Sequence, residues 1–332
     1  MRTRKLGPFD ASALGLGCMG MSHGYGTPDN VESACVLHRA LDLGCTFLDT
    51  AALYGFGANE SLLGATLRLR RHEYTLASKG GMFRNAAGRR EIDGRPEVLK
   101  RACEDSLQRL RTDVIDLYYL HRVDPRVPLA DSIGALAELV REGKVRTIGL
   151  SEVSAETLRR AHAIHSITAV QSEYSLWTRN PELRVLSACR ELGVAFVAFS
   201  PLGRGFLTGR LGSFADLPAT DIRRGMPRFQ GENFTRNLAL LDGFARLAGE
   251  AGCSMAQLAL AWVLAQGEHI IPIPGTHRLE HLEENLHAAG VTVSADVLAR
   301  VAALIQPRTV AGPRYDAVQQ REIDTEEFST AA

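Results

Sequence analysis

Four side chains capable of acid–base chemistry follow short apolar segments of this sequence. Asp49 ends the segment CTFLD, and Tyr54 lies five residues further on. Lys79 ends TLASK, and His121 directly follows DLYYL. A phenol has an ordinary pKa of about 10, and a neighbouring cationic lysine lowers it. With a carboxylate to hold the lysine and an imidazole to orient the substrate, this set predicts a proton donor for carbonyl reduction.

Each of these residues also has a purely structural explanation. Asp49 could cap the next helix, and Lys79 could be a surface lysine. His121 could be a buried core histidine, and Tyr54 an aromatic side chain at an interface. The catalytic interpretation therefore depends on their joint occurrence, since four independent structural accidents would have to fall on one side of the fold.

The segments before these residues belong to a repeated pattern of amphipathic helix, glycine and apolar strand. Residues 30–43 are followed by Gly44 and CTFLD, and two further helical segments end at Gly143 and Gly193. Continuous apolar runs are typical of parallel strands that helices cover on both sides. We predict strands near residues 14–18, 45–49, 74–79, 114–120, 146–150, 168–171, 194–199 and 270–274.

Eight such units predict an α/β fold, a closed (β/α)8 TIM barrel with its active site at the C-terminal strand ends. We expect one domain over residues 1–332, with the barrel at about 13–305. Residues 2–14 predict an N-terminal β-hairpin that caps the barrel, and 306–332 a polar C-terminal tail beyond it. Residues 203–235, rich in Gly, Arg and Pro, form a long loop typical of a lid or a binding loop.

A glycine pattern at residues 14–20, LGLGCMG, matches the letters of a dinucleotide-binding turn. That turn requires a helix to begin directly after it. Gly24, Gly26 and Pro28 follow instead, so the sequence argues against a Rossmann phosphate loop. We interpret the segment as the first barrel strand and its loop.

Composition excludes several function classes. Lys+Arg and Asp+Glu balance at 38 each, so no nucleic-acid partner is expected. The N-terminus lacks the apolar core of a signal peptide, and the apolar stretch 258–265 is too short to span a membrane. Six cysteines without a C-x-x-C pair are typical of reduced thiols. We therefore expect a cytoplasmic protein that binds no membrane, and without H-E-x-x-H or a strand-end His-x-His we expect no metal.

Three segments carry a resemblance to a known family: FLDTAALYGFGANESLLG (47–64), LKRACEDSLQRLRTDVIDLYYLH (99–121) and IPIPGTHRLEHLEENLHA (271–288). From about residue 2 to about 305, the sequence resembles the aldo-keto reductase family. The resemblance implies a barrel that binds NADPH or NADP+ without a Rossmann fold and reduces aldehydes or ketones to alcohols. It also implies a catalytic tetrad of Asp49, Tyr54, Lys79 and His121.

The resemblance also places the cofactor along the strand ends. Ser151 and Gln171 would contact the nicotinamide carboxamide, and Phe199 would stack on the ring. Residues 200–209 match the pyrophosphate loop, and Arg278 would favour NADPH over NADH. The expected cofactor contacts are Cys18, Met19, Asp49, Ser151, Gln171, Phe199, Ser200, Pro201, Leu202, Gly203, Gly205, Gly275, Thr276, His277, Arg278, His281, Glu284 and Asn285.

Glu152 departs from the family's pattern, because many members have asparagine there. A carboxylate can only accept hydrogen bonds. Glu152 could therefore receive the carboxamide NH2 while Ser151 and Gln171 meet the carbonyl oxygen.

The expected partner is a small-molecule carbonyl substrate. We predict that Met21, Tyr54, His121 and Trp177 contact it, with Tyr25, Met82 and Phe83 as further cavity walls. Trp177 could equally be a packing residue at the barrel rim. An apolar rim favours aromatic or hydrophobic carbonyl compounds.

Two other functions remain open on the sequence alone. One is a redox-sensing regulatory subunit that binds the cofactor and resembles potassium-channel β subunits; it would turn over slowly even with saturating aldehyde. The other is a metal-dependent hydrolase on the same barrel, which the missing metal motifs disfavour. The sequence does not indicate an oligomeric state.

Overall fold

Eight parallel strands form a barrel in the computed structural model, which describes residues 1–85 and 89–328. They are β3 (Leu16–Gly17), β4 (Phe47–Asp49), β5 (Thr75–Gly80), β8 (Ile115–Leu120), β9 (Val145–Ser151), β10 (Ile167–Glu173), β11 (Ala195–Phe199) and β12 (Ile270–Ile273). The first and last strands meet where Gly15 N donates to Pro272 O at 3.0 Å and Gly17 N to Pro274 O at 3.2 Å. The predicted barrel and all eight predicted strand positions are confirmed.

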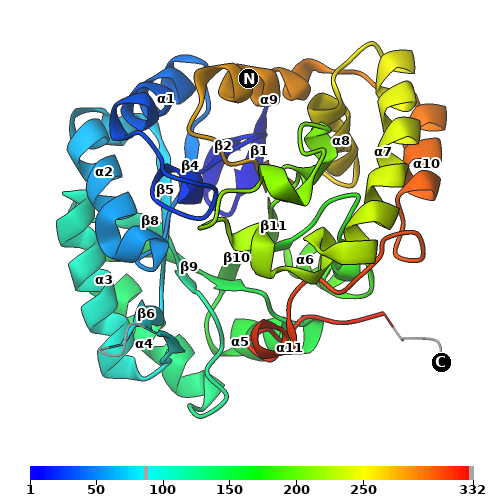
Figure 1. Ribbon diagram of the computed structural model, residues 1–332. Helices are drawn as coiled ribbons and strands as arrows, with labels where there is room; N and C mark the ends of the chain where they lie inside the picture. Colours follow the sequence, from blue (N-terminus) through cyan, green and yellow to red (C-terminus); the bar gives the residue numbers. More distant parts are fainter. Residues whose placement is uncertain (86–88, 329–332) are drawn as a thin grey trace.

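Helices surround these strands as an outer ring (Figure 1). They are α1 (Asn30–Asp42), α2 (Ala58–Leu67), α3 (Pro96–Leu110), α4 (Leu129–Arg141), α5 (Ala155–Ile164), α6 (Val185–Leu192), α7 (Gly231–Glu250), α8 (Met255–Ala265), α9 (Leu279–His287), α10 (Ala295–Leu304) and α11 (Ala317–Gln320). Their ends follow the local sequence: Asp29 caps α1 with its carboxylate, and Gly193 ends α6 with a φ of 67°.

Short elements connect this framework. An antiparallel pair, β6 (Met82–Arg84) and β7 (Arg90–Ile92), follows β5. The 3₁₀ helices are η1 (Met19–Met21), η2 (Tyr54–Gly57), η3 (Arg68–Glu73), η4 (Asn180–Glu182), η5 (Phe206–Thr208), η6 (Phe214–Asp216), η7 (Ile222–Gly225), η8 (Pro227–Phe229) and η9 (Ala288–Gly290). Four of them, η5 to η8, lie in the predicted loop 203–235, which consists largely of tight turns and whose last residues, from Gly231, begin α7.

The barrel interior is closed from below by a hairpin. Strands β1 (Thr3–Leu6) and β2 (Phe9–Ser12) pair antiparallel, which confirms the predicted cap. Leu6 and Ala11 from this hairpin are buried in one apolar cluster with inward-facing strand residues such as Phe47 and Tyr119. The barrel is thus a filled core, and its accessible end is the C-terminal one.

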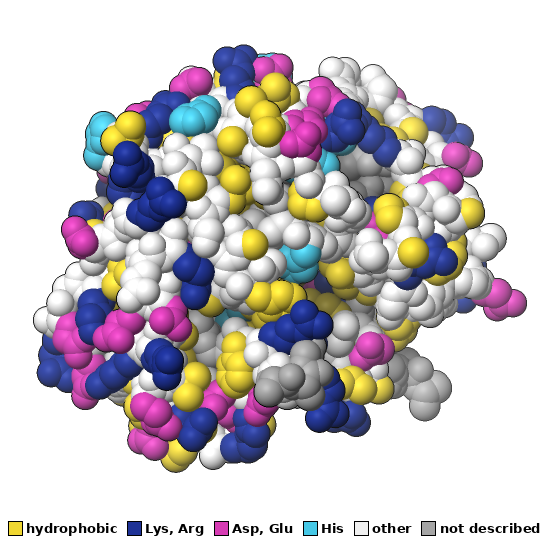
Figure 2. All heavy atoms as spheres, turned by 60° about the vertical axis from the view of Figure 1, so that its left-hand side comes forward, with side chains coloured by type: hydrophobic (Ala, Val, Ile, Leu, Met, Phe, Trp, Pro, Cys, Tyr) yellow, Lys and Arg dark blue, Asp and Glu magenta, His cyan; other side chains and the backbone are white. Residues whose placement is uncertain are grey.

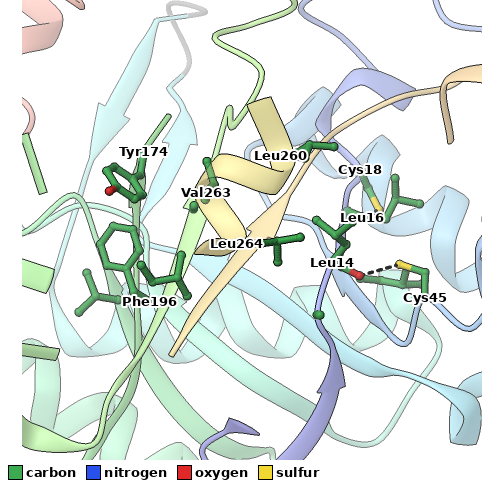
Figure 3. Close-up of a cluster of buried hydrophobic side chains, with 14 of the residues drawn as sticks. Leu14, Leu16, Cys18, Cys45, Tyr174, Phe196, Leu260, Val263 and Leu264 are labelled. Atoms are coloured by element: carbon green, nitrogen blue, oxygen red, sulfur yellow. Dashed lines mark hydrogen bonds between the residues drawn. The ribbon is translucent and has the colours of Figure 1, made fainter. Parts of the chain in front are cut away.

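A second apolar layer lies between strands and helices. Figure 3 shows Leu260, Val263 and Leu264 of α8 between the start of the first strand and Phe196 of β11. Cys45 lies in the same layer, where its Sγ donates to the backbone O of Leu14 at 3.4 Å. Burying these apolar faces is what fixes each helix against the barrel.

The glycines of the LGLGCMG segment have a packing role. A Cβ at Gly15 would lie 2.7 Å from Cδ1 of Phe47, and one at Gly17 would lie 2.9 Å from the backbone O of Ile273. Both glycines therefore allow β3 to approach its neighbours closely enough to close the barrel. Close packing between strands therefore explains why the G-x-G pattern occurs here without a phosphate-binding turn.

The C-terminal tail packs on the barrel rather than extending beyond it. Val153 and Asp324 form a parallel bridge, and the Asp324 carboxylate accepts a hydrogen bond from Ser154 Oγ at 3.0 Å. Glu326 Oε1 accepts from the backbone N of Ala155 at 2.8 Å. The tail thus lies over the start of α5.

Basic and acidic side chains are intermixed over the face shown in Figure 2, as expected from the balanced composition. Among the described residues, no single helix is long and apolar enough to cross a membrane. Helices α7 and α8 meet that test only as a pair, with a bend of 81° between them.

Candidate active site

The C-terminal ends of β4, β5 and β8 bring the predicted tetrad together. Asp49 ends β4, Lys79 lies near the end of β5, and Tyr54 begins η2. Lys79 Nζ donates to Asp49 Oδ1 at 2.5 Å and to the Tyr54 hydroxyl at 3.2 Å. The rings of Tyr54 and His121 meet edge-on, with centroids 6.0 Å apart. Gln171 Nε2 donates to the second oxygen of Asp49 at 2.7 Å, so the carboxylate is held from both sides.

The protonation states follow from burial and charge. Burial would lower the pKa of Lys79, but Asp49 and Tyr54 raise it, so the amine is a cation. Burial lowers the pKa of His121 well below its ordinary value, and the charge of Arg122 lowers it further, so the imidazole is neutral.

The pKa of Tyr54 differs from our expectation. Burial raises the pKa of the phenol above 10, and the charge of Asp49 adds to this, while Lys79 lowers it. The prediction of a net decrease is wrong, because the desolvation of the buried phenolate outweighs the attraction of one lysine. Lys79 still moves the pKa in the predicted direction, and its ammonium polarises the hydroxyl directly.

A cavity of about 590 Å³ opens beside the tetrad and runs across the strand ends to α9. Predicted residues that line it are Met19, Asp49, Tyr54, His121, Ser151, Gln171, Phe199, Ser200, Pro201, Leu202, Gly205, Gly275, Thr276, His277, His281, Glu284 and Asn285. Tyr25 and Met82 line it too. Most of the predicted site therefore lies around one continuous space, with Lys79 directly behind the Tyr54 hydroxyl.

The end of this cavity near β11 and β12 is suited to phosphate groups. Ser200 and Arg204 have φ values of 48° and 58°, and the backbone N–H groups of Leu202 and Arg204 find no acceptor in the described residues. Such a turn presents its amides to an anion. The N-terminus of α9 (Leu279–His287) adds a favourable helix dipole. Phe199 ends β11 at the cavity wall, where its flat face can stack on a ring.

Trp177 is not a cavity residue, so its predicted contact with substrate is wrong. Its side chain is 1% exposed and stacks on Phe206, with ring centroids 4.1 Å apart and planes 9° apart. It also meets Phe229 edge-on at 5.2 Å. Gly203, an expected cofactor contact, lies beneath it, because a Cβ there would be 2.9 Å from the indole. Trp177 is therefore a packing residue, the alternative given above, and it packs against Gly203, Phe206 and Phe229 of the loop 203–235.

Cys18 and Met21 are likewise buried behind the cavity wall. Figure 3 shows Cys18 among the apolar side chains of the outer layer. The backbone O of Cys18 accepts a hydrogen bond from Asn59 Nδ2 at 2.8 Å. Their neighbour Met19 is the residue of this turn that reaches the cavity. Phe83 does not line the cavity either and is partly exposed on β6.

Arg278, the cation predicted near the adenosine phosphate, does not line the cavity in this structure, whereas another arginine, Arg210, does. Arg278 is exposed and pairs with Glu280 at 2.8 Å, outside the cavity lining. Arg210 lines the cavity, contacts His281, and pairs with Glu284 at 2.9 Å. The arginine-rich composition of the loop 203–235 was the signal for it, but the position could not be read from composition.

Glu152 belongs to a buried ionic cluster and does not face the cavity. Its Oε1 accepts from the backbone N of Glu173 at 2.8 Å, and its Oε2 accepts from Arg314 of the tail. Arg204 pairs with Glu173 through two hydrogen bonds, of 2.9 and 2.6 Å. The suggestion that Glu152 receives the carboxamide is therefore wrong, because both carboxylate oxygens already have buried donors.

Several cavity residues were missed in the sequence. Tyr315 and Gln319 of the tail line the cavity, as do Arg122, Arg204 and Arg223. The tail was treated as lying beyond the barrel because its polar composition resembles that of a solvated extension. Arg122 directly follows His121, so the strand-end rule that found His121 could also have found it.

Comparison with known proteins identifies the family. A model of the Aldo/keto reductase family matches residues 13–306. The chain belongs to this family. The Glycine max protein named "Probable aldo-keto reductase 1" is 45% identical over 309 residues, which cover 92% of this chain and 89% of that protein. An aldo-keto reductase of Schizosaccharomyces pombe, named with NADP(+), is 44% identical over 319 residues and 94% of each chain.

Solved structures have the same fold as this aldo/keto reductase over nearly the whole chain. A glycerol dehydrogenase of Gluconobacter oxydans has a TM-score of 0.85 at 28% identity, covering 95% of this chain and 98% of its own. An aldo-keto reductase of Klebsiella pneumoniae, in complex with NADP and acetate, has a TM-score of 0.72 at 27% identity, covering 95% and 99%. The predicted family, barrel fold and oxidoreductase class are confirmed.

Proposed function

We propose that this aldo/keto reductase uses NADPH to reduce aldehydes or ketones to alcohols, with Tyr54 as the proton donor. The observation that carries the proposal is the hydrogen-bonded chain from Asp49 through Lys79 to the Tyr54 hydroxyl, with distances of 2.5 and 3.2 Å, at the wall of the cavity. When bound, the cofactor supplies the hydride that adds to the carbonyl carbon.

The chain's own residues handle the proton. The Tyr54 hydroxyl donates it to the carbonyl oxygen, which gains negative charge as the carbon is reduced. Lys79 stabilises the phenolate left behind, and Asp49 keeps that ammonium in place. The neutral His121 beside Tyr54 orients the carbonyl oxygen by a hydrogen bond.

The cavity supports a dinucleotide with an added phosphate. Ser151 and the Oε1 oxygen of Gln171 are available to a carboxamide at one end, since Gln171 uses its nitrogen on Asp49. The turn at residues 200–205 and the start of α9 are suited to the phosphates at the other end. The printed name of the S. pombe relative and the NADP in the K. pneumoniae structure support the choice of cofactor.

Replacing the phenol tests the proposal. Tyr54→Phe should lower kcat/KM for aldehyde reduction by about 10²- to 10⁴-fold, the usual contribution of a positioned general acid. NADPH binding, measured by quenching of intrinsic fluorescence, should change little, because the hydroxyl faces the substrate. Tyr118→Phe is the matched control, since Tyr118 lies on the helix-facing side of β8, outside the cavity lining.

Near-normal turnover by Tyr54→Phe would show that another group donates the proton. A wild-type protein that binds NADPH but turns over very slowly with saturating aldehyde would instead favour the regulatory alternative. These two results are distinct, so each identifies which part of the proposal has failed.

A further inference from the structure

Arg122 lies next to the catalytic residues and has not been given a role. It follows His121 directly and lines the same cavity. Its Nη1 donates to the backbone O of His121 at 2.6 Å and to Ser151 Oγ at 3.0 Å. These bonds hold the half-buried guanidinium across the ends of β8 and β9, within the substrate end of the cavity.

Within residues 1–85 and 89–328, no carboxylate forms an ion pair with Arg122. Among the arginines that line the cavity, four form ion pairs: Arg90 with Glu322, Arg204 with Glu173, Arg210 with Glu284, and Arg223 with Asp221. For Arg122 the described residues provide no such partner, and its Nε and Nη2 have no acceptor among them.

The acids in the cavity wall are already engaged. Asp49 is bound to Lys79, Glu284 is bound to Arg210, and Asp216 completes a capping box with Ser213. None of them can turn to Arg122 without losing its own partner. The positive charge therefore acts on the site itself, in agreement with its contribution to lowering the pKa of His121.

The cofactor does not neutralise this charge either, if the proposed function holds. Its phosphates belong at residues 200–205 and the start of α9, which follow β11 and β12. Arg122 follows β8, where the uncharged carboxamide would meet Ser151. Among the described groups and the proposed cofactor, none brings a negative charge to Arg122, so a substrate anion is the group that it is placed to bind.

We propose that the preferred substrates are aldehydes or ketones that carry a carboxylate, which Arg122 binds while Tyr54 protonates the carbonyl oxygen. The free Nε and Nη2 match the two oxygens of a carboxylate, a geometry that arginine forms with more specificity than lysine. This inference rests on the proposed function and adds to it a substrate class that an apolar rim alone would not suggest.

A pair of matched substrates tests the inference. We would measure kcat/KM for para-carboxybenzaldehyde and for its uncharged methyl ester with wild type, Arg122→Gln and Arg122→Lys. Wild type should prefer the carboxylate, and Arg122→Gln should lose about 10- to 100-fold on it, the range for a hydrogen bond to a charged group. The ester should lose much less than the carboxylate, because a loss through the Arg122 contacts with His121 and Ser151 affects both substrates equally and only the carboxylate loses an ion pair as well. The loss should appear in KM rather than kcat, because the contact exists before and during the reaction.

Three readouts keep the test independent of folding defects. Arg122→Lys keeps the positive charge but lacks the two adjacent N–H donors of the guanidinium, so it should retain part of the preference for the carboxylate over the ester. With wild type alone, added KCl should lower kcat/KM for the carboxylate and leave the ester unchanged, because salt screens a partly exposed ion pair. Equilibrium binding of para-(hydroxymethyl)benzoate, the product anion, should weaken in Arg122→Gln by the same factor.

The inference is overturned if wild type prefers the ester, or if Arg122→Gln lowers both substrates equally, which would make Arg122 a support for His121. In either case reduction of the ester leaves the proposed function standing. If wild type binds NADPH but reduces neither compound, the proposed function fails and the inference falls with it.

Discussion

Replacing Arg314 by methionine should release the C-terminal tail from the barrel. The Arg314 side chain is 4% exposed, and it pairs with the fully buried carboxylates of Glu152 and Glu173. In Arg314→Met, Glu173 keeps Arg204, but Glu152 is left as a buried charge without a cation. Removing one partner of a buried pair costs about 3–5 kcal/mol, so we expect a loss of this size in the free energy of unfolding.

The pKa of Glu173 gives a second measure of the same cluster. Burial alone would raise the pKa of this carboxyl, but Arg204, Arg314 and Arg228 hold it at about 2, below its ordinary 4.5. One pKa unit corresponds to about 1.4 kcal/mol, so the lowered pKa contributes about 3 kcal/mol at neutral pH. Because the folded-state pKa is lowered, this stability is present above pH 4.5 and is lost as the pH falls towards 2. In Arg314→Met that pH dependence should be weaker.

Urea unfolding at neutral and acidic pH measures both effects. The double variant Arg314→Met/Glu152→Gln should recover part of the lost stability, because the glutamine carries no charge and its oxygen can still accept from the backbone N of Glu173. The substrate KM should rise in the single variant, since Tyr315 and Gln319 of the released tail line the cavity.

The reasoning would be refuted by a single variant within about 0.5 kcal/mol of wild type, the range of a neutral surface change. A double variant at least as unstable as Arg314→Met would also contradict it, since the cost would then not come from an unpaired Glu152. If Arg314→Met reduced the stability but left KM unchanged, the buried ionic cluster would contribute to folding without positioning the tail residues of the cavity wall.

Two further predictions concern the cofactor and the proton. Arg210→Ala should weaken NADPH binding about tenfold, or 1.4 kcal/mol, and leave NADH binding nearly unchanged. Arg278→Ala should have a smaller effect, because the Arg278 side chain pairs with Glu280 at the surface. Equal losses of affinity for both cofactors in Arg210→Ala would contradict the assignment. The rate of carbonyl reduction should fall as the pH rises through the raised pKa of Tyr54, while the rate of alcohol oxidation should rise over the same range. In Lys79→Gln this transition should move to higher pH, because Lys79 lowers that pKa. Parallel pH profiles for the two directions would exclude a shared tyrosine.

The sequence was most informative where function depends on local spacing. Asp49, Lys79 and His121 each follow a buried strand, and in a parallel barrel those strand ends must converge on one rim. Tyr54 was found for a related reason, since it lies five residues after Asp49, on the loop that follows β4. The tetrad could therefore be predicted from the strands alone, before any resemblance was considered.

Prediction failed where a residue's role depends on distant segments. The sequence around Trp177 is compatible both with a substrate contact and with stacking on Phe206. Only the path of the loop 203–235, which contains Phe206, decides between these two roles. Arg278 and Arg210 differ in the same way, because the turn after η5 brings Arg210 to His281, which lies 71 positions later. The net pKa of Tyr54 depends on burial, which spacing along the chain does not reveal.

Glu152 shows how a departure from a family pattern can mislead when it is interpreted locally. Its φ of 55° lies in the left-handed region, where asparagine is tolerated and a longer side chain is strained. The Glu152 carboxylate accepts a hydrogen bond from Arg314, which lies 162 positions further along the chain. Glu152 therefore helps to hold the polar tail at the strand ends, and both of its carboxylate oxygens are engaged there.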